Sequence, residues 1–304
     1  MAVARRRTLR QRENLEFYLF ISPWLVGFVV FVAGPMLATF AFSFASWDLL
    51  TAPKFVGLAN YAKMLAEDPL FWKALQVSAI YSLVGIPLHI AFALLVAILL
   101  NQNIRAVALI RTIYYMPSVL SGVAVAVLWL WIFNPNFGPI NLILKTIGVE
   151  GPLWLGSQTW ALPALIIVSL WGVGGAMVIF LAGLQGIPTA LYEAAAIDGA
   201  NAWHRFWHVT VPMISPVLFF NLVMGIINSF QAFTNAYVMT QGGPNYATLM
   251  YVLYLYQNGF RFFQMGYASA LAWVLFLLIL LLTLLVFRSS PAWVYYEGEL
   301  RGRR

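Results

Sequence analysis

The sequence predicts an all-α membrane protein with six spanning helices and both ends of the chain on the same side. Of its 304 residues, 62% are hydrophobic and 9% are charged, whereas soluble domains are about 45–50% apolar and about 25% charged. Six long intervals contain no Asp, Glu, Lys or Arg: 17–47, 74–104, 112–144, 151–192, 206–260 and 262–287. A spanning helix needs about 20 apolar residues, so each interval has room for one.

The first helix is expected at about 17–44 and the second at about 75–100, with kinks at Gly34-Pro35 and at Pro87. The first apolar run is about 28 residues long, and signal peptides have apolar regions of about 7–15 residues, so we expect this helix to be retained. The other four helices are expected at about 108–133, 161–184, 213–238 and 267–287.

The Lys and Arg residues indicate the orientation of these helices, because cytoplasmic loops are enriched in both. With six spans, one side of the membrane holds both tails and the even-numbered loops. That side carries 12 of the 17 basic residues: Arg5, Arg6, Arg7, Arg10, Arg12, Arg105, Arg111, Arg205, Arg288, Arg301, Arg303 and Arg304. The other side carries Lys54, Lys63, Lys73, Lys145 and Arg261. Both termini are therefore predicted to be cytoplasmic. Anionic lipid headgroups account for the net charge of +7, and nothing suggests nucleic acid binding.

The predicted spans contain almost no ionisable groups. His89 is the only one near the middle of a span, and we interpret it as a polar contact with a neighbouring helix. Ion-coupled carriers, voltage sensors and cation-selective pores depend on charged groups inside the membrane, so this absence argues against those classes. The chain has no cysteine, which excludes disulfides and thiol chemistry. It also lacks the HExxH, GxSxG and GxxxxGK[ST] motifs, and we predict neither a catalytic site nor a metal site.

Amides gather on one face of the fifth predicted helix. Asn221, Asn228, Gln231 and Asn235 stand at i, i+7, i+10 and i+14, which is one helical face. One interpretation is hydrogen bonding between helices. The other, which we favour, is a lining for a neutral polyhydroxylated substrate, since amides both donate and accept hydrogen bonds. Ser169 and Trp171 on the fourth helix are expected to lie nearby in the bundle.

A polar segment interrupts the apolar runs between the fourth and fifth helices. It carries Glu193, Asp198, His204, Arg205 and His208, and it reads as two short helices joined by a turn at Asp198-Gly199. Small residues around the turn leave room for another protein to approach closely. An amphipathic helix lying on lipid is the competing interpretation. His204 and His208 are spaced like metal ligands, but no third ligand is evident, so we expect them to be solvated.

The segment contains Glu193-Ala194-Ala195, followed by Gly199, Val209, Val211 and Pro212. With this spacing it resembles the EAA signature of binding-protein-dependent ABC importer permeases, with Val209 and Val211 at two positions where the family has Ile and Leu. Phe55 to Tyr61, Asn134-Pro135 with Gly138 and Asn141, and Gly242-Gly243-Pro244 resemble the sugar-uptake branch of that family. The resemblance covers nearly the whole chain and implies a single transmembrane permease domain, residues 1–304, with a cytoplasmic coupling loop at 185–212.

The resemblance also implies partners and roles. A second homologous permease subunit would complete the pathway, two ATPase subunits would bind ATP and Mg, and an extracytoplasmic solute-binding protein would deliver a sugar. This chain would then be a multi-pass protein of a prokaryotic inner membrane, with no cofactor of its own and no enzymatic activity. The implied ATPase-coupling residues are Glu193, Ala194, Ala195, Asp198, Gly199, Ala200 and Pro212. The expected substrate pathway contains Ser169, Trp171, Asn228, Gln231 and Asn235.

Two alternatives remain at this point. The first is an ion-coupled secondary carrier or channel that acts without an ATPase; it would need a buried coupling charge or inverted repeats with broken helices, and the sequence has neither feature. The second is a membrane-embedded enzyme that uses His89, His204 and His208. These histidines are scattered across predicted helices and loops, which argues against a common site.

Overall fold

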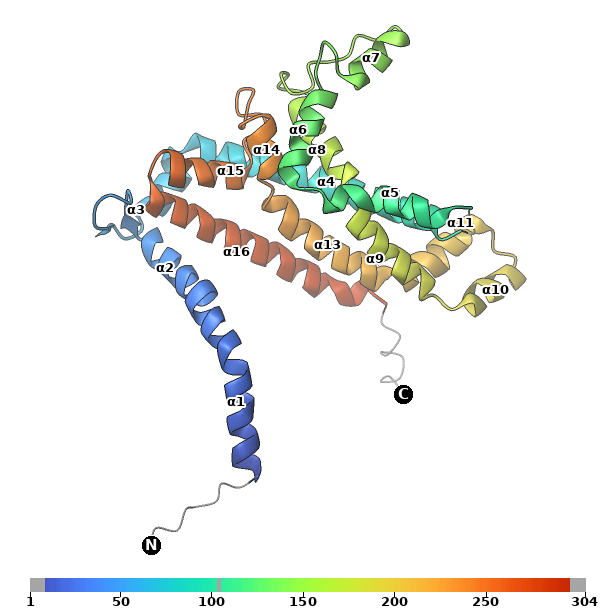
Figure 1. Ribbon diagram of the computed structural model, residues 1–304, viewed down its shortest axis with the longest axis horizontal. Helices are drawn as coiled ribbons and strands as arrows, with labels where there is room; N and C mark the ends of the chain where they lie inside the picture. The colour runs from blue at the N-terminus through green and yellow to red at the C-terminus, as the bar shows by residue number, and fades with distance from the viewer. Residues whose placement is uncertain (1–8, 103–104, 296–304) are drawn as a thin grey trace. The chain divides into compact units, whose positions relative to one another are not determined.

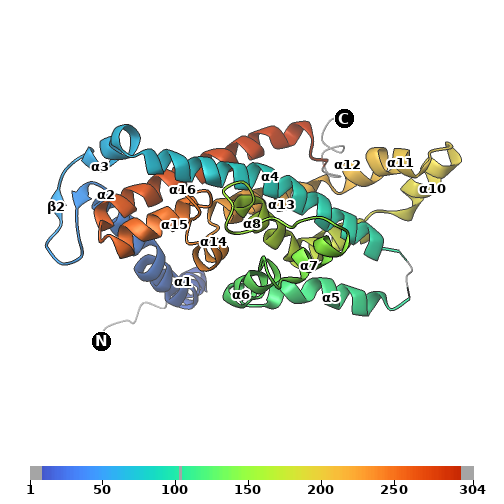
Figure 2. The ribbon, with the colours of Figure 1, turned by 90° about the horizontal axis from the view of Figure 1, so that it is seen from above.

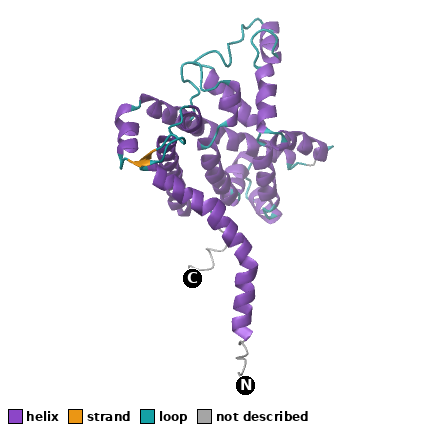
Figure 3. Cartoon of the chain, turned by 60° about the vertical axis from the view of Figure 1, so that its left-hand side comes forward, coloured by secondary structure: helices purple, strands orange, loops and turns teal. Residues whose placement is uncertain are grey.

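The structure is a computed structural model that describes residues 9–102 and 105–295. The tail residues Arg5, Arg6, Arg7, Arg301, Arg303 and Arg304, which contribute to the orientation prediction, lie outside the described residues. Helix dominates the described part of the chain, and its strands form one small antiparallel pair (Figure 3). The chain divides into two compact units, residues 1–66 with 258–273 and residues 67–257 with 274–304.

The first unit begins with one long helix that changes its winding partway. α1 (Leu9–Phe28) continues through a π-helical turn, η1 (Val29–Ala33), into α2 (Gly34–Ser43) (Figure 1). Pro35 has no N–H to donate to the carbonyl of Phe31, so the regular helical pattern must change here. The N–H of Gly34 bonds instead to the oxygen of Val29. The predicted irregularity at Gly34-Pro35 is thus a π-helical turn.

Polar side chains connect the remaining elements of the first unit. β1 (Ala45–Ser46) pairs with β2 (Lys54–Phe55), and α3 (Ala59–Ala62) leads into the π-helical segment η2 (Lys63–Glu67). The Nδ2 of Asn60 donates to the carbonyl oxygens of Ser43 and Ala45, each at 2.9 Å. The unit is completed by η4 (Gln257–Arg261) and the first part of α16 (Met265–Ser289), whose Trp273 ring meets the edge of Phe40.

The second unit is organised around α4 (Pro69–Leu100). Asp68 caps this helix by accepting from the N–H groups of Leu70 and Phe71 at 2.9 and 3.2 Å, and Pro69 occupies its first turn. The helix continues through Pro87 without a break. It packs against α8 (Ala161–Trp171), α9 (Gly174–Gln185), α13 (Ser215–Phe230) and α15 (Tyr251–Tyr256), several of which lie along it in Figure 2.

Shorter elements complete the second unit. α5 (Val107–Val119) packs on α9, and α6 (Gly122–Ile132) packs on α14 (Thr234–Met239). α7 (Pro139–Thr146) lies in the connection between α6 and α8. α10 (Thr189–Ile197), α11 (Ala202–Arg205), the π-helical turn η3 (Phe206–Thr210) and α12 (Val211–Met213) connect α9 to α13. The last element is η5 (Ser290–Ala292).

Within the described residues, four helical stretches are long and apolar enough to cross a membrane: Glu16–Ser43, Pro69–Leu100, Ser215–Met239 and Met265–Ala292. Two bent pairs bring the total to six if each pair is one span. The prediction of an all-α membrane protein is confirmed. The structure interrupts two of the predicted helices: α5 and α6 meet at 103° within 108–133, and α8 and α9 meet at 49° within 161–184.

The first break has a local cause, and the second lies where two helices come close together. Leu120 and Ser121 adopt extended backbone angles just after Pro117, and this ends α5 before α6 begins at Gly122. α9 begins at Gly174, where an added Cβ would lie 2.5 Å from the carbonyl oxygen of Tyr114 in α5. The close approach of α9 to α5 therefore requires glycine at this position.

Candidate functional site

The polar segment between α9 and α13 is a helical hairpin whose turn is built around Gly199. The N–H of Ala200 bonds to the carbonyl of Ala195 at 2.9 Å, and the N–H of Gly199 bonds to the carbonyl of Ala196 at 3.1 Å. With Gly199 at φ +78°, this is a Schellman motif, in which glycine takes the left-handed conformation that ends the helix. Asn201 then caps α11 by accepting from the N–H of His204 at 2.9 Å.

The first helix of this hairpin exposes an acidic and small-residue surface. Glu193, Ala194, Ala196 and Asp198 are exposed on or next to α10, and Ile197 is 88% exposed. Among the described residues, Glu193 is not bonded to any neighbouring side chain. A carboxylate beside exposed apolar surface is a feature of protein interaction sites rather than of a folded interior.

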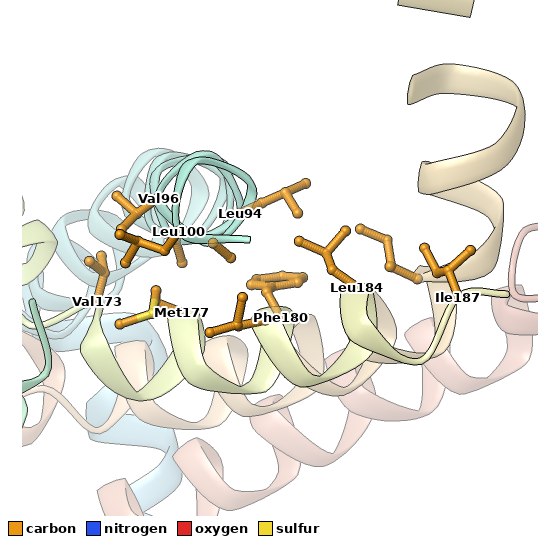
Figure 4. Close-up of a cluster of buried hydrophobic side chains, with 12 residues drawn as sticks. Leu94, Val96, Leu100, Val173, Met177, Phe180, Leu184 and Ile187 are labelled. Carbon is orange, nitrogen blue, oxygen red and sulfur yellow. The ribbon is translucent and has the colours of Figure 1, made fainter. Parts of the chain in front are cut away.

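The base of the hairpin is anchored to the bundle. Tyr192 Oη and Thr210 Oγ1 lie 3.0 Å apart and join α10 to η3. Ile187 is buried in an apolar cluster that includes Met177, Phe180 and Leu184 of α9 and residues of α4, as Figure 4 shows. Tyr192, Phe206 and Val209 pack against the same cluster. Packed side chains therefore connect the base of the hairpin to α4 and α9.

The two histidines of the hairpin are engaged within it. His204 Nδ1 lies 2.9 Å from Asn201 Oδ1, and His208 Nδ1 lies 3.0 Å from the carbonyl oxygen of His204. Their rings stack with centroids 5.9 Å apart. Among the described residues, no group of three His, Asp or Glu side chains is placed to hold a metal ion.

A second feature of the bundle is a cavity of about 390 Å³ between α4, α8, α9 and α13. None of the described residues that line it is Asp, Glu, Lys or Arg. Its polar lining consists of Tyr81, His89, Ser169, Asn221, Asn228 and Ser229. Apolar side chains such as Ile86, Ile179, Phe220 and Met224 complete the walls. An uncharged cavity with several hydroxyl and amide groups suits a neutral polar ligand.

The sequence-predicted pathway residues divide into two groups. Ser169 and Asn228 line the cavity, as does Asn221 of the amide face. Trp171, Gln231 and Asn235 are not among the lining residues. The prediction of one continuous amide face is wrong beyond Asn228, because α13 ends at Phe230 and Asn235 belongs to α14. Trp171 meets the edge of the Trp129 ring at 6.0 Å.

Among the polar residues that line the cavity, three were not predicted from the sequence as part of a substrate lining. Tyr81 and His89 come from α4 and Ser229 from α13. The fourth and eighth positions after Tyr81 are Gly85 and His89, so this face of α4 was visible in the sequence. The sequence did not show that this face of α4 points towards Ser169 and Asn228.

The broken helical spans, the exposed hairpin and the uncharged cavity are compatible with a multispanning membrane transport protein. The chain belongs to the family described as binding-protein-dependent transport system inner membrane components, whose sequence model matches residues 89–293. The resemblance found in the EAA segment is thereby confirmed. The chain is a multi-pass inner-membrane permease subunit of an ABC importer, so ATP is handled by the partner ATPase. The alternatives of an ion-coupled carrier and of a membrane enzyme are set aside.

Relatives match over nearly the whole chain. The chain is 46% identical over 302 residues to "Probable ABC transporter permease protein YesP" of Bacillus subtilis (strain 168), covering 98% of this chain and 97% of that protein. It is 35% identical over 297 residues to the "Lactose transport system permease protein LacF" of Rhizobium radiobacter, covering 95% of this chain and 99% of that protein.

The fold also matches a solved structure. A chain of a bacterial ABC transporter that imports the acidic polysaccharide alginate superposes with a TM-score of 0.81, covering 92% of this chain and 96% of that chain. The two sequences are 22% identical, so this similarity concerns the fold. The importer to which the present chain belongs includes a solute-binding protein, as the family description states.

Proposed function

We propose that this chain forms one half of a carbohydrate translocation pathway, paired with a second homologous permease and driven by two ATPase subunits. Several relatives carry sugar-related names, such as LacF and the "Trehalose/maltose transport system permease protein MalF" of Thermococcus litoralis, which is 34% identical over 279 residues. The observation that carries the proposal is the cavity of about 390 Å³, which offers hydroxyl and amide groups without a carboxylate or ammonium group.

The cavity chemistry supports a carbohydrate over other solutes. Sugar hydroxyls both donate and accept hydrogen bonds, and the groups of Ser169 and Asn228 can do the same. The apolar walls suit the C–H faces of a sugar ring. Trp171, Gln231 and Asn235 stand outside the cavity, and we assign them to more distant parts of the pathway.

The cavity proposal is tested by Asn228→Leu in the assembled, reconstituted transporter. We expect sugar uptake at low substrate concentration to fall about tenfold, because a site built around an amide is left without its hydrogen-bonding partner. Met224→Leu changes an apolar residue of the same cavity without changing its polar groups, and it should transport normally. Equal uptake by wild type and Asn228→Leu would contradict the proposal.

The proposed docking surface for the ATPase lies in the loop at 185–212. Its contact residues are Glu193, Ala194, Ala195, Asp198 and Ala200, its turn is at Gly199, and Pro212 leads into α13. The exposure of Glu193 and Ile197 supports this assignment, as does the anchoring of the hairpin base to α4 and α9. Both termini and this loop are assigned to the cytoplasmic side.

Glu193→Lys tests the docking surface. Reversing a charge in a desolvated interface should weaken retention of the ATPase roughly tenfold or more and abolish uptake, while the permease remains in the membrane. Glu150→Lys reverses an exposed carboxylate outside this loop and should retain the ATPase normally. Normal ATPase retention by Glu193→Lys would remove Glu193 from the docking surface.

A further inference from the structure

A second cavity, of about 530 Å³, lies where α4 ends and the hairpin begins. Asn101 and Gln102 line it from the end of α4, and Arg205 and Thr210 line it from the α11–η3 segment. It does not share a lining residue with the proposed substrate cavity. α4 is a candidate membrane span that ends at Leu100, so this cavity adjoins one end of that span.

Arg205 lies in the wall of this cavity and has no anionic partner among the described residues. It is half-buried, and its Nε atom is buried without a hydrogen-bond partner. Within the described residues it makes neither an ion pair nor a side-chain hydrogen bond. Arg111 Nε is likewise buried without a partner, but Arg111 donates from Nη2 to the carbonyl oxygen of Leu100 at 2.8 Å. A partly buried guanidinium with free donors is costly unless an anion satisfies it.

The rest of the lining is suited to an amphipathic anion. None of the described lining residues is Asp or Glu, so nothing in the cavity repels a negative group. The amides of Asn101 and Gln102 add donors, while Ile98, Leu184 and Phe206 supply an apolar wall. Donors on one side and apolar surface on the other fit a charged headgroup with its attached glycerol better than a free ion.

The position of Arg205 is held by its neighbours. Thr210 Oγ1 donates to the carbonyl oxygen of Arg205 at 3.4 Å and lies 3.0 Å from Tyr192 Oη. The side chain therefore extends from a backbone that is tied to α10. Trp203, which is 67% exposed, and Trp207 flank Arg205 in the sequence. Exposed tryptophans are typical of the headgroup layer of a membrane.

We propose that this cavity binds the phosphate of an anionic phospholipid through the guanidinium of Arg205. Basic pockets between helices at the membrane surface are suited to such headgroups, and the fork of a guanidinium can donate two parallel hydrogen bonds to phosphate oxygens. The bound lipid bridges the end of α4 and the base of the hairpin, so it stiffens the connection between the membrane domain and the docking surface. A free phosphate ion has the same chemistry and is the alternative source of the anion.

The test uses the complete transporter purified in a neutral detergent and stripped of lipid. Phosphatidylglycerol or phosphatidylcholine is added, and retained lipid is measured by native mass spectrometry. We expect retention of phosphatidylglycerol but not of phosphatidylcholine. Arg205→Gln should weaken this retention about tenfold, since a charge-assisted hydrogen bond is lost. Arg105→Gln removes an exposed arginine between α4 and α5 that does not line the cavity, and it should behave as wild type.

The remaining outcomes decide the source and the validity of the site. Displacement of phosphatidylglycerol by millimolar inorganic phosphate would identify free phosphate as the ligand and overturn the lipid assignment. Equal retention by wild type and Arg205→Gln, or equal retention of both lipids, would overturn the site altogether. If the transporter with Arg205→Gln does not assemble, Gln102→Leu tests the same cavity, because Gln102 also lines it. Loss of phosphatidylglycerol from the Gln102→Leu transporter would support the site, and unchanged retention would refute it.

Discussion

Replacing Gly199 with alanine should disturb the turn of the hairpin through its backbone alone. Gly199 has φ +78°, and a Cβ added there would meet nothing within 4 Å. The cost is therefore that of placing a residue with a Cβ in the left-handed conformation, about 1–2 kcal/mol. Alanine recovers about 0.4–1 kcal/mol by restricting the unfolded chain. The net destabilisation of the turn is then about 1 kcal/mol, or about fivefold in its opening equilibrium.

The chain provides a matched control for this change. Gly175, near the start of α9, also has open space around its missing Cβ, but it does not have a left-handed φ. Gly175→Ala restricts the unfolded chain to the same extent, but it does not force a residue with a Cβ into the left-handed conformation. The difference between the two variants should therefore approach the left-handed penalty itself, about 1–2 kcal/mol. Gly199→Asn should fall between wild type and Gly199→Ala, because asparagine tolerates this conformation.

The assay is amide hydrogen exchange at the hairpin of the assembled transporter. The N–H groups of Gly199 and Ala200 bond to the carbonyls of Ala196 and Ala195, so they report opening of the turn directly. Exchange at the turn should be about fivefold faster in Gly199→Ala, and transport per ATP hydrolysed should fall. If Gly199→Ala and Gly175→Ala exchange alike at Gly199 and Ala200, the left-handed conformation does not control the turn and the reasoning fails.

Two further changes test local contacts, one in the connection between α6 and α8 and one at the base of the hairpin. Gly151→Ala would place its Cβ 2.1 Å from Asn141 Oδ1, which accepts from Trp154 Nε1 at 2.7 Å. The loop between α6 and α8 should therefore lose about 1–3 kcal/mol of local stability, measured by hydrogen exchange. Gly156→Ala is the control, because its added Cβ would make only an ordinary contact with Leu153 at 3.6 Å. Equal protection in the two variants would show that the close contact between residue 151 and Asn141 does not stabilise the loop. Tyr192→Phe removes the hydrogen bond to Thr210 and should destabilise the hairpin base by about 1 kcal/mol. Unchanged exchange at residues 205–210 would show that this bond contributes nothing.

Much of the site was visible in the sequence because it depends on local chemistry. The turn at Asp198-Gly199 was predicted from residues that favour left-handed backbone, and the structure places Gly199 at φ +78°. Ser169 and Asn228 were predicted as neighbours, and they line the same cavity. The amide periodicity failed beyond Asn228, because a helical face exists only while the helix continues and α13 ends at Phe230.

The sequence by itself determined the class of protein. Long charge-free intervals must form hydrogen-bonded helices in a membrane, since no water is present to satisfy their backbone groups. The spacing of the EAA residues from Glu193 to Pro212 identified the protein family. Tertiary structure decided which faces of these helices meet. It brought His89 of α4 into the same cavity as Ser169 and Asn228, and it left Gln231 and Asn235 out of that lining. It also placed Arg205 in a second cavity without an anionic partner among the described residues. These outcomes depend on contacts between residues far apart in the chain, which helical periodicity does not encode.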